Sequence, residues 1–245
     1  MAIKKKRKII YTAVALFVLV GMVLSVTLGF LYDLFSVSGK GKYSLPDVVA
    51  MVNNEEITGD ELEFQFEQLR YFYEMQGVDL NNVEMRRQVQ LQILQEIINE
   101  TLLFQGAQKE GISVSDSEVE AEYEEILSER FGGDEEALEE ELANQNLTTA
   151  ESKENIARRL KIEEYIAQYT EANFDEEERE ASEEDLQELY EEYLSFFKDD
   201  EDTDVPDFEE LKPLLQAEWE QRKRGEVINK LLEELKEEGE IEILI

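Results

Sequence analysis

The longest run of apolar residues at helical spacing outside the N-terminus lies at residues 83–109. Val89, Ile93, Ile97 and Phe104 fall on one side of the helix that this spacing predicts. A second row lies beside them, formed by Leu91, Leu94, Ile98 and Leu102. Because so wide an apolar stripe is stable only when other elements cover it, the pattern predicts a core helix around which the chain packs.

Further helices are predicted from their start signals. A Ser or Thr followed three residues later by Glu or Asp is typical of a capped helix N-terminus, and this pattern begins at Thr58, Ser115, Thr148 and Ser182. Asp134 and Asp207 provide two more starts, and the last helix is expected to end at Gly239.

Two short segments read as strands, residues 48–52 and the tail at 241–245, where isoleucine alternates with other residues. A tight turn at Asn53-Asn54 leads from the first into a return strand at 55–57. Because a lone terminal strand needs a partner, the tail is expected to pair with residues 48–52. The predicted fold class is mainly α, with a small sheet that pairs N- and C-terminal strands.

The N-terminus has the pattern of a membrane anchor. Residues 9–31 contain no charge and would span roughly 35 Å as a helix, and five basic residues precede them. The positive-inside rule then predicts a cytoplasmic segment at 1–8, a transmembrane helix at 9–31, a linker at 32–46 and an extracytoplasmic domain at 47–245. The protein would be a single-pass protein of the cell membrane. The alternative is a cleaved signal peptide, although the run is longer than usual for one and no A-x-A-like site follows it.

Charge and composition exclude several functions. The chain has 60 acidic and 24 basic residues, for a net charge of −36, so its surface repels nucleic acid. Cysteine and histidine are both absent from the sequence, which excludes Ser-His-Asp and Cys-His catalysis and thiolate or histidine metal sites. Asp200, Asp202 and Asp204 have the spacing that opens a calcium loop, but Val205 and Leu211 stand where Gly and Glu are needed. No catalytic, cofactor or metal site is therefore predicted, and the protein is not expected to be an enzyme.

Several large apolar residues suggest a binding surface, because some of them fall off the main apolar stripes. They are Phe64, Phe72, Met75, Phe196 and Trp219. Most such residues belong to a core. The functional alternative is a groove that accepts many apolar segments, since aromatic and methionine side chains repack easily.

Residues 47–245 resemble the N-terminal chaperone domain of the SurA, PpiD and PrsA foldases. The resemblance rests on the opening VVAMVNNEEITGDELEFQFEQL, on LLFQGAQKEGISVSDSEVE, on SEEDLQELYEEY and on the closing helix from FEELKPLLQAEWEQ onward. In those foldases a parvulin isomerase domain stands where this chain has only an acidic loop at 198–207, and parvulin sites use histidines. The resemblance implies an ATP-independent holdase for unfolded, newly exported polypeptides, with a PpiD-like anchor and without isomerase activity. The alternative function is a membrane-tethered structural or adaptor protein that docks one envelope partner.

Overall fold

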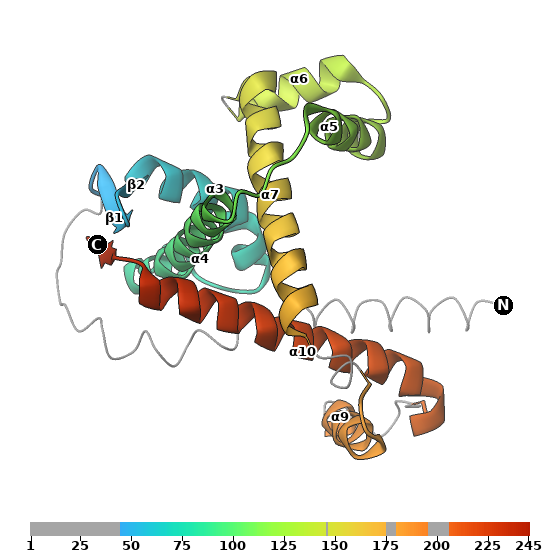
Figure 1. The fold of residues 1–245 in the computed structure, drawn as a ribbon. Coiled ribbons are helices and arrows are strands. Elements are labelled where there is room, and N and C mark those ends of the chain that lie inside the picture. The colour runs from blue at the N-terminus through green and yellow to red at the C-terminus, as the bar shows by residue number, and fades with distance from the viewer. Residues whose placement is uncertain (1–44, 146, 175–179, 196–205) are drawn as a thin grey trace. The chain divides into compact units, whose positions relative to one another are not determined.

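The helix that the other elements cover is α4 (Val83–Lys109), as the sequence predicted. It packs against α3 (Gly59–Met75), α7 (Thr149–Asn173) and α10 (Phe208–Glu238), and against strand β1 (Val48–Val52). The structure is a computed structural model that describes residues 45–145, 147–174, 180–195 and 206–245. These residues belong to one structural unit, Leu45–Ile245, whose helices and strands are labelled in Figure 1.

The described part is mainly helical, with seven helices and one three-stranded sheet. The elements not yet named are β2 (Glu55–Thr58), α5 (Asp116–Phe131), α6 (Glu135–Asn144), α9 (Glu183–Ser195) and β3 (Ile241–Ile243). None of the helices in these ranges is long and apolar enough to cross a bilayer. The predicted anchor at 9–31 and most of the predicted linker at 32–46 lie outside the described residues, as does most of the acidic loop at 198–207.

The sheet confirms the predicted pairing of the two ends of the domain. Its strand order is β2-β1-β3, and both neighbours run antiparallel to β1. Ala50 in the central strand lies opposite Ile57 on one side and Ile243 on the other. The isoleucines at 241, 243 and 245 all pack against the main core, so the C-terminal strand closes the domain that β1 opens.

The turn between β1 and β2 is tied to two distant segments through Asn53. This residue has a φ of 55°, a left-handed conformation that asparagine tolerates better than most residues. Its side-chain Nδ2 donates to Gln105 Oε1 of α4 at 2.6 Å, and its Oδ1 accepts from the backbone N–H of Glu240 at 2.9 Å. The Asn53 amide also donates to the Glu240 carbonyl. One turn residue thus joins α4 to the segment that leads into β3.

We expect Asn53→Ala to lower the free energy of unfolding by about 1–2 kcal/mol, because it removes two side-chain hydrogen bonds and puts alanine in a left-handed conformation. Equilibrium denaturation of the full chain measures this loss. The neighbouring turn residue provides the control, since Asn54→Ala is expected to change stability by less than about 0.5 kcal/mol. Equal losses at the two positions would show that Asn53 does not join the segments.

The main core lies under the sheet and along the inner sides of α3 and α4. Its fully buried side chains include Phe66, Leu62, Leu94 and Ile98. The two buried polar groups of α4 are satisfied: Gln90 Nε2 donates to Glu63 at 3.0 Å, and Thr101 Oγ1 donates to the Ile97 carbonyl at 2.8 Å. The wide stripe of α4 is therefore covered without orphaned polar atoms on its buried side.

Three smaller clusters join the remaining helices. Leu103, Ile162 and Leu231 meet where α4, α7 and α10 pack together. There the Tyr169 hydroxyl of α7 donates to Glu234 of α10 at 2.8 Å, and burial together with this bond raises the pKa of Tyr169 to about 12. The second cluster joins α5 to α6, and the third joins α9 to the N-terminal half of α10.

The predicted helix starts are confirmed in detail. Ser115 and Glu118 form a reciprocal capping box at α5, and Thr148 and Glu151 form another at α7. These hydrogen bonds hold the pKa of both glutamates below the usual value of 4.5. Just beyond the C-terminus of α4, Gly111 takes a φ of 73°, a left-handed conformation that commonly ends a helix.

Candidate functional site

Helix α3 is apolar on two opposite sides. Leu62 and Phe66 are buried and Tyr73 packs beside them, so this side faces the main core. An amphipathic helix would normally be polar on its other side. In α3 the other side carries four large apolar side chains instead: Phe64, Tyr71, Phe72 and Met75. We call these four residues the outer stripe.

The outer stripe is open to solvent. Phe64 and Phe72 are each 42% exposed, Met75 is 70% exposed and Tyr71 is 73% exposed. Their spacing of three, four or seven residues places them close together on the helix surface. Contiguous exposed apolar side chains on a soluble domain typically mark a surface that binds another molecule. The outer stripe is therefore the candidate binding surface.

A row of carboxylates runs along one edge of the outer stripe. Asp60, Glu67 and Glu74 are each seven residues apart, so they fall nearly in line along α3. Arg70 lies on the side of this row away from the stripe and bonds Glu67 at 3.2 Å and Glu74 at 3.0 Å. These bonds, first to Glu74 and then to Glu67, raise the pKa of Arg70. We call Asp60, Glu67 and Glu74 the acidic row.

The structure brings together three of the five residues that the sequence singled out. Phe64, Phe72 and Met75 all lie in the outer stripe. Trp219 lies on α10, half-buried in the α9–α10 cluster, where the Lys223 ammonium sits 5.0 Å from its ring centroid. Phe196 lies outside the described residues. Sequence reasoning missed Tyr71, which could have been found from its seven-residue spacing to Phe64.

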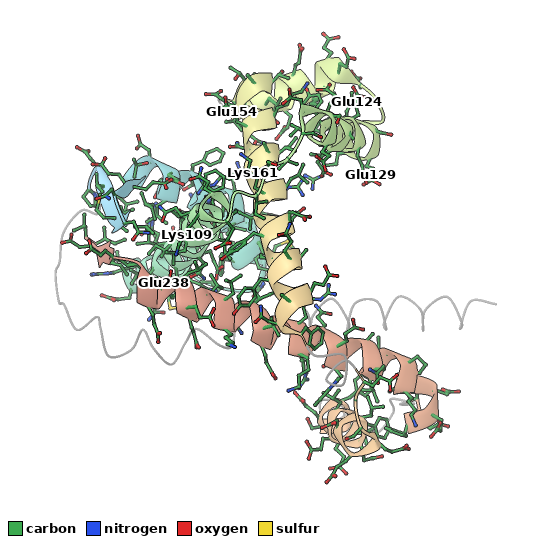
Figure 2. All side chains as sticks on the ribbon, in the orientation of Figure 1. Lys109, Glu124, Glu129, Glu154, Lys161 and Glu238 are labelled. Atoms are coloured by element: carbon green, nitrogen blue, oxygen red, sulfur yellow. The ribbon has the colours of Figure 1, made fainter. Side chains whose placement is uncertain are left out.

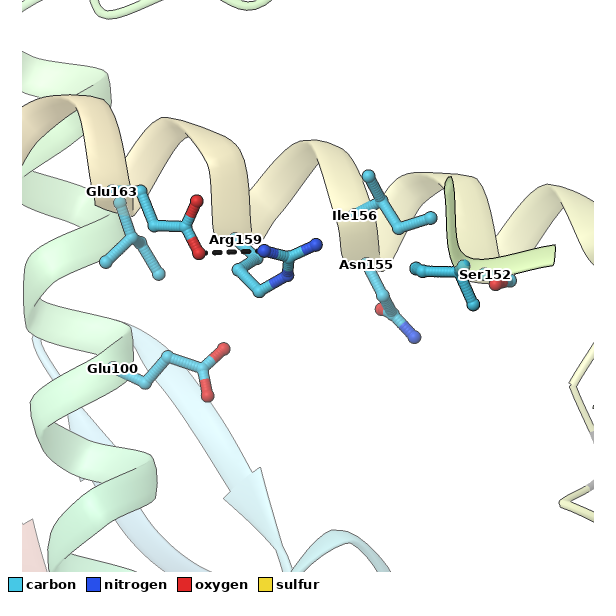
Figure 3. Close-up of a pocket in the computed structure, with 8 residues that line it drawn as sticks. Glu100, Ser152, Asn155, Ile156, Arg159 and Glu163 are labelled. Carbon is cyan, nitrogen blue, oxygen red and sulfur yellow. Dashed lines mark hydrogen bonds and ion pairs between the residues drawn. The ribbon is translucent and has the colours of Figure 1, made fainter. Parts of the chain in front are cut away.

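A hollow lies between α4, α5 and α7 (Figure 3). This cavity of about 540 Å³ combines three isoleucines with polar groups; it is lined by Glu100, Ile126, Ser152, Asn155, Ile156, Arg159, Ile162 and Glu163. Arg159 bonds Glu163 at 2.8 Å and also pairs with Glu122, so its charge is already neutralised. The cavity has room for an apolar side chain. Its lining comes from three helices, which explains why no spacing in the sequence indicated it.

The acidic side chains of the described residues do not gather into a metal-binding group. Within the parts of the chain that the structure describes, no group of three or more carboxylates is placed to hold a metal ion. The Asp200, Asp202 and Asp204 spacing falls outside those parts. Figure 2 shows acidic side chains on different helices, with Glu124 and Glu129 on α5, Glu154 on α7 and Glu238 on α10.

Comparison with models of protein families identifies the family of this chain. The model of the SurA-like N-terminal domain matches residues 2–166, about two thirds of the chain. The chain belongs to this family. The match includes all of α3 and α4, so the outer stripe lies within the family's domain. The resemblance drawn from the sequence is thereby confirmed.

Two further proteins similar to this SurA-like chain were found. The foldase protein PrsA of Caldanaerobacter subterraneus subsp. tengcongensis is 29% identical over 174 residues. That match covers 68% of this chain but 49% of PrsA, so the chain spans about half the length of this relative. A solved structure of a SurA-like chaperone of Campylobacter jejuni matches with a TM-score of 0.50 and 13% identity. It covers 81% of this chain and 99% of the other, and at this identity it establishes the fold alone.

Proposed function

We propose that the protein is a membrane-anchored, extracytoplasmic chaperone that holds unfolded exported polypeptides without ATP. The observation that carries the proposal is the outer stripe, a set of large apolar side chains on the solvent side of a helix whose other side packs on the main core through Leu62 and Phe66. Membership of the SurA-like family and the names of its relatives, a foldase and a SurA-like chaperone, support the same activity.

The stripe is suited to many clients rather than to one. Phenylalanine, tyrosine and methionine bury large apolar areas, and methionine adapts its shape to different neighbours. Phe64 and Met75 lie 11 residues apart, so the stripe is about 16 Å long on the helix. An unfolded segment could cover it with a few apolar side chains and leave again quickly, because this area is small beside a stable interface.

The proposed anchor is the uncharged segment at 9–31, which the basic residues before it orient with the N-terminus in the cytoplasm. A short linker would then keep the domain close to the point where exported chains emerge. Protease protection in sealed membrane vesicles tests this topology. Digestion of the domain from the cytoplasmic side would contradict it.

The proposal also excludes prolyl isomerase activity by this chain, because the sequence has no histidine for a parvulin site. A proline-peptide isomerisation assay is expected to give the uncatalysed rate. A rate above background that scales with protein concentration would contradict this part of the proposal.

Aggregation of a chemically denatured exported protein tests the holding activity. The full chain is expected to suppress light scattering at an equimolar ratio, and Phe64→Gln with Phe72→Gln is expected to remove most of the suppression. The matched control is Leu214→Gln with Leu244→Gln, since those leucines are 44% and 45% exposed but lie elsewhere, in α10 and just after β3. Each pair should change stability by less than about 1 kcal/mol, because all four positions are exposed. Equal suppression by both double variants would reject the outer stripe as the site.

Recovery of bound proteins from solubilised membranes separates this function from the adaptor alternative. A chaperone is expected to retain a broad set of exported proteins. One folded partner in a fixed ratio would instead indicate an adaptor.

A further inference from the structure

We infer that the outer stripe selects apolar client segments that carry lysine or arginine, in preference to acidic or uncharged ones. The inference rests on the proposed chaperone function and specifies its substrate class. It follows from the position of the acidic row, which runs directly beside the stripe on the same helix.

Helix geometry fixes the relation between the row and the stripe. With about 100° per residue, Asp60, Glu67 and Glu74 lie roughly 40–80° around the helix from Phe64. Tyr71 lies between Phe64 and the row. Gln68, Glu61 and Gln65 lie on the opposite side of Phe64, at roughly 40°, 60° and 100° from it. A segment that packs on the stripe therefore meets the acidic row along one edge, and beyond the middle of the stripe it meets the carboxylate of Glu61 and two uncharged amides.

The acidic row remains negative after its internal pairing. Arg70 is the only basic residue in the sequence of α3, and its single charge is shared between Glu67 and Glu74. The three side chains are 40–47% exposed, so solvent screens the pairing and it can exchange with a basic side chain of a client. Between residues 59 and 87 the chain has seven acids against three bases, so the surroundings add to the negative potential.

The row also has a length that suits an unfolded segment. Fourteen residues separate Asp60 from Glu74, which is about 21 Å along a helix. An extended chain covers that distance with about six residues. A segment of this length with a base at each end would place both bases at the acidic row while its apolar side chains cover Phe64, Tyr71 and Phe72.

The negative charge around the outer stripe disfavours the other molecules that could cover an apolar surface. A second copy of this chain would bring one acidic row against another, and its net charge of −36 adds repulsion at longer range. An anionic lipid surface is repelled in the same way. A basic, apolar polypeptide is the occupant that the electrostatics favour.

Three fluorescent peptides test the inference. They share one apolar core of six residues and differ only in their flanks, which carry two Lys, two Gln or two Glu at each end. Binding is measured by anisotropy with the full chain in zwitterionic nanodiscs, and empty nanodiscs serve as the blank. We expect the Lys-flanked peptide to bind about tenfold more tightly than the Glu-flanked one at low salt, and this ratio to shrink at 1 M salt.

Two double variants test whether the acidic row causes the preference for Lys-flanked peptides. Glu67→Gln with Glu74→Gln is expected to reduce the ratio between Lys- and Glu-flanked peptides by at least half. The control Glu139→Gln with Glu140→Gln removes the same charge from the exposed side of α6 and is expected to keep the ratio.

The outcomes are distinguishable. Equal binding of the three peptides would overturn the inference while leaving the chaperone proposal intact. Binding of none of them would overturn both. A ratio that falls equally in both double variants would show that overall charge, and not the acidic row, selects the client. Self-association that Phe72→Gln abolishes would instead assign the stripe to a second copy.

Discussion

Replacing Phe66 with alanine is expected to lower the free energy of unfolding by about 3–5 kcal/mol. The Phe66 side chain is fully buried in the main core, beneath the sheet and against α4. The Arg86 guanidinium lies 4.7 Å from its ring centroid and pairs with Glu63, so the substitution also removes the surface on which this ion pair rests. Equilibrium denaturation of the full chain measures the loss.

Phe64 provides the matched control, because it has the same side chain two residues earlier on the same helix. It is 42% exposed, so Phe64→Ala is expected to cost less than about 1 kcal/mol. The effects on client holding should be in the opposite order to the effects on stability. Phe64→Ala is expected to weaken client holding, whereas the folded fraction of Phe66→Ala is expected to retain it. Similar stability losses at the two positions would contradict the assignment of the two sides of α3.

Replacing Gly106 with leucine is expected to destabilise the protein by about 2–3 kcal/mol through overpacking. Gly106 is buried where α4 meets α7, and a Cβ placed on it would lie 2.7 Å from Cε1 and 3.0 Å from the hydroxyl of Tyr165. A leucine side chain extends well beyond Cβ, so it must displace the tyrosine ring or move the two helices apart. Thermal or chemical denaturation detects the loss.

Gly225 is the control for this substitution, since it also lies inside a helix but a Cβ there would meet nothing within 4 Å. Gly225→Leu is expected to be neutral or to stabilise the protein by up to about 1 kcal/mol, because leucine favours helix more than glycine does. Adding Tyr165→Ala to Gly106→Leu should recover part of the lost stability. The effects of the two substitutions would then be non-additive in a double-mutant cycle. Equal changes in stability for the two glycine variants would contradict the close approach of α7 to α4.

Local signals in the sequence were sufficient for much of the fold. The stripe of α4 is visible because its apolar residues repeat at helical spacing, and the capping boxes at Ser115 and Thr148 are visible because each needs only four residues. The pairing of β3 with β1 could be predicted although the strands are far apart, since a terminal strand without a partner would be unstable. These features depend on neighbouring residues or on a simple rule of pairing.

The candidate binding surface was only partly predictable. The sequence indicated Phe64, Phe72 and Met75 because they fall off the core stripe of α3, but it could not distinguish them from Trp219, whose surroundings are formed by α9. The cavity between α4, α5 and α7 depends on how three helices pack, and no local pattern encodes that. Exposure is a tertiary property, so it had to come from the structure.

Site-specific photo-crosslinking tests the central claim most directly. Gln68 is exposed and lies four residues from both Phe64 and Phe72, so a photoreactive residue there would point from within the outer stripe. Gln221 on α10 is also exposed and serves as the control position. With the full chain and a denatured exported protein, we predict client crosslinks from position 68 that far exceed those from position 221. Equal crosslinking from the two positions, or none from position 68 while the client is held, would contradict the account.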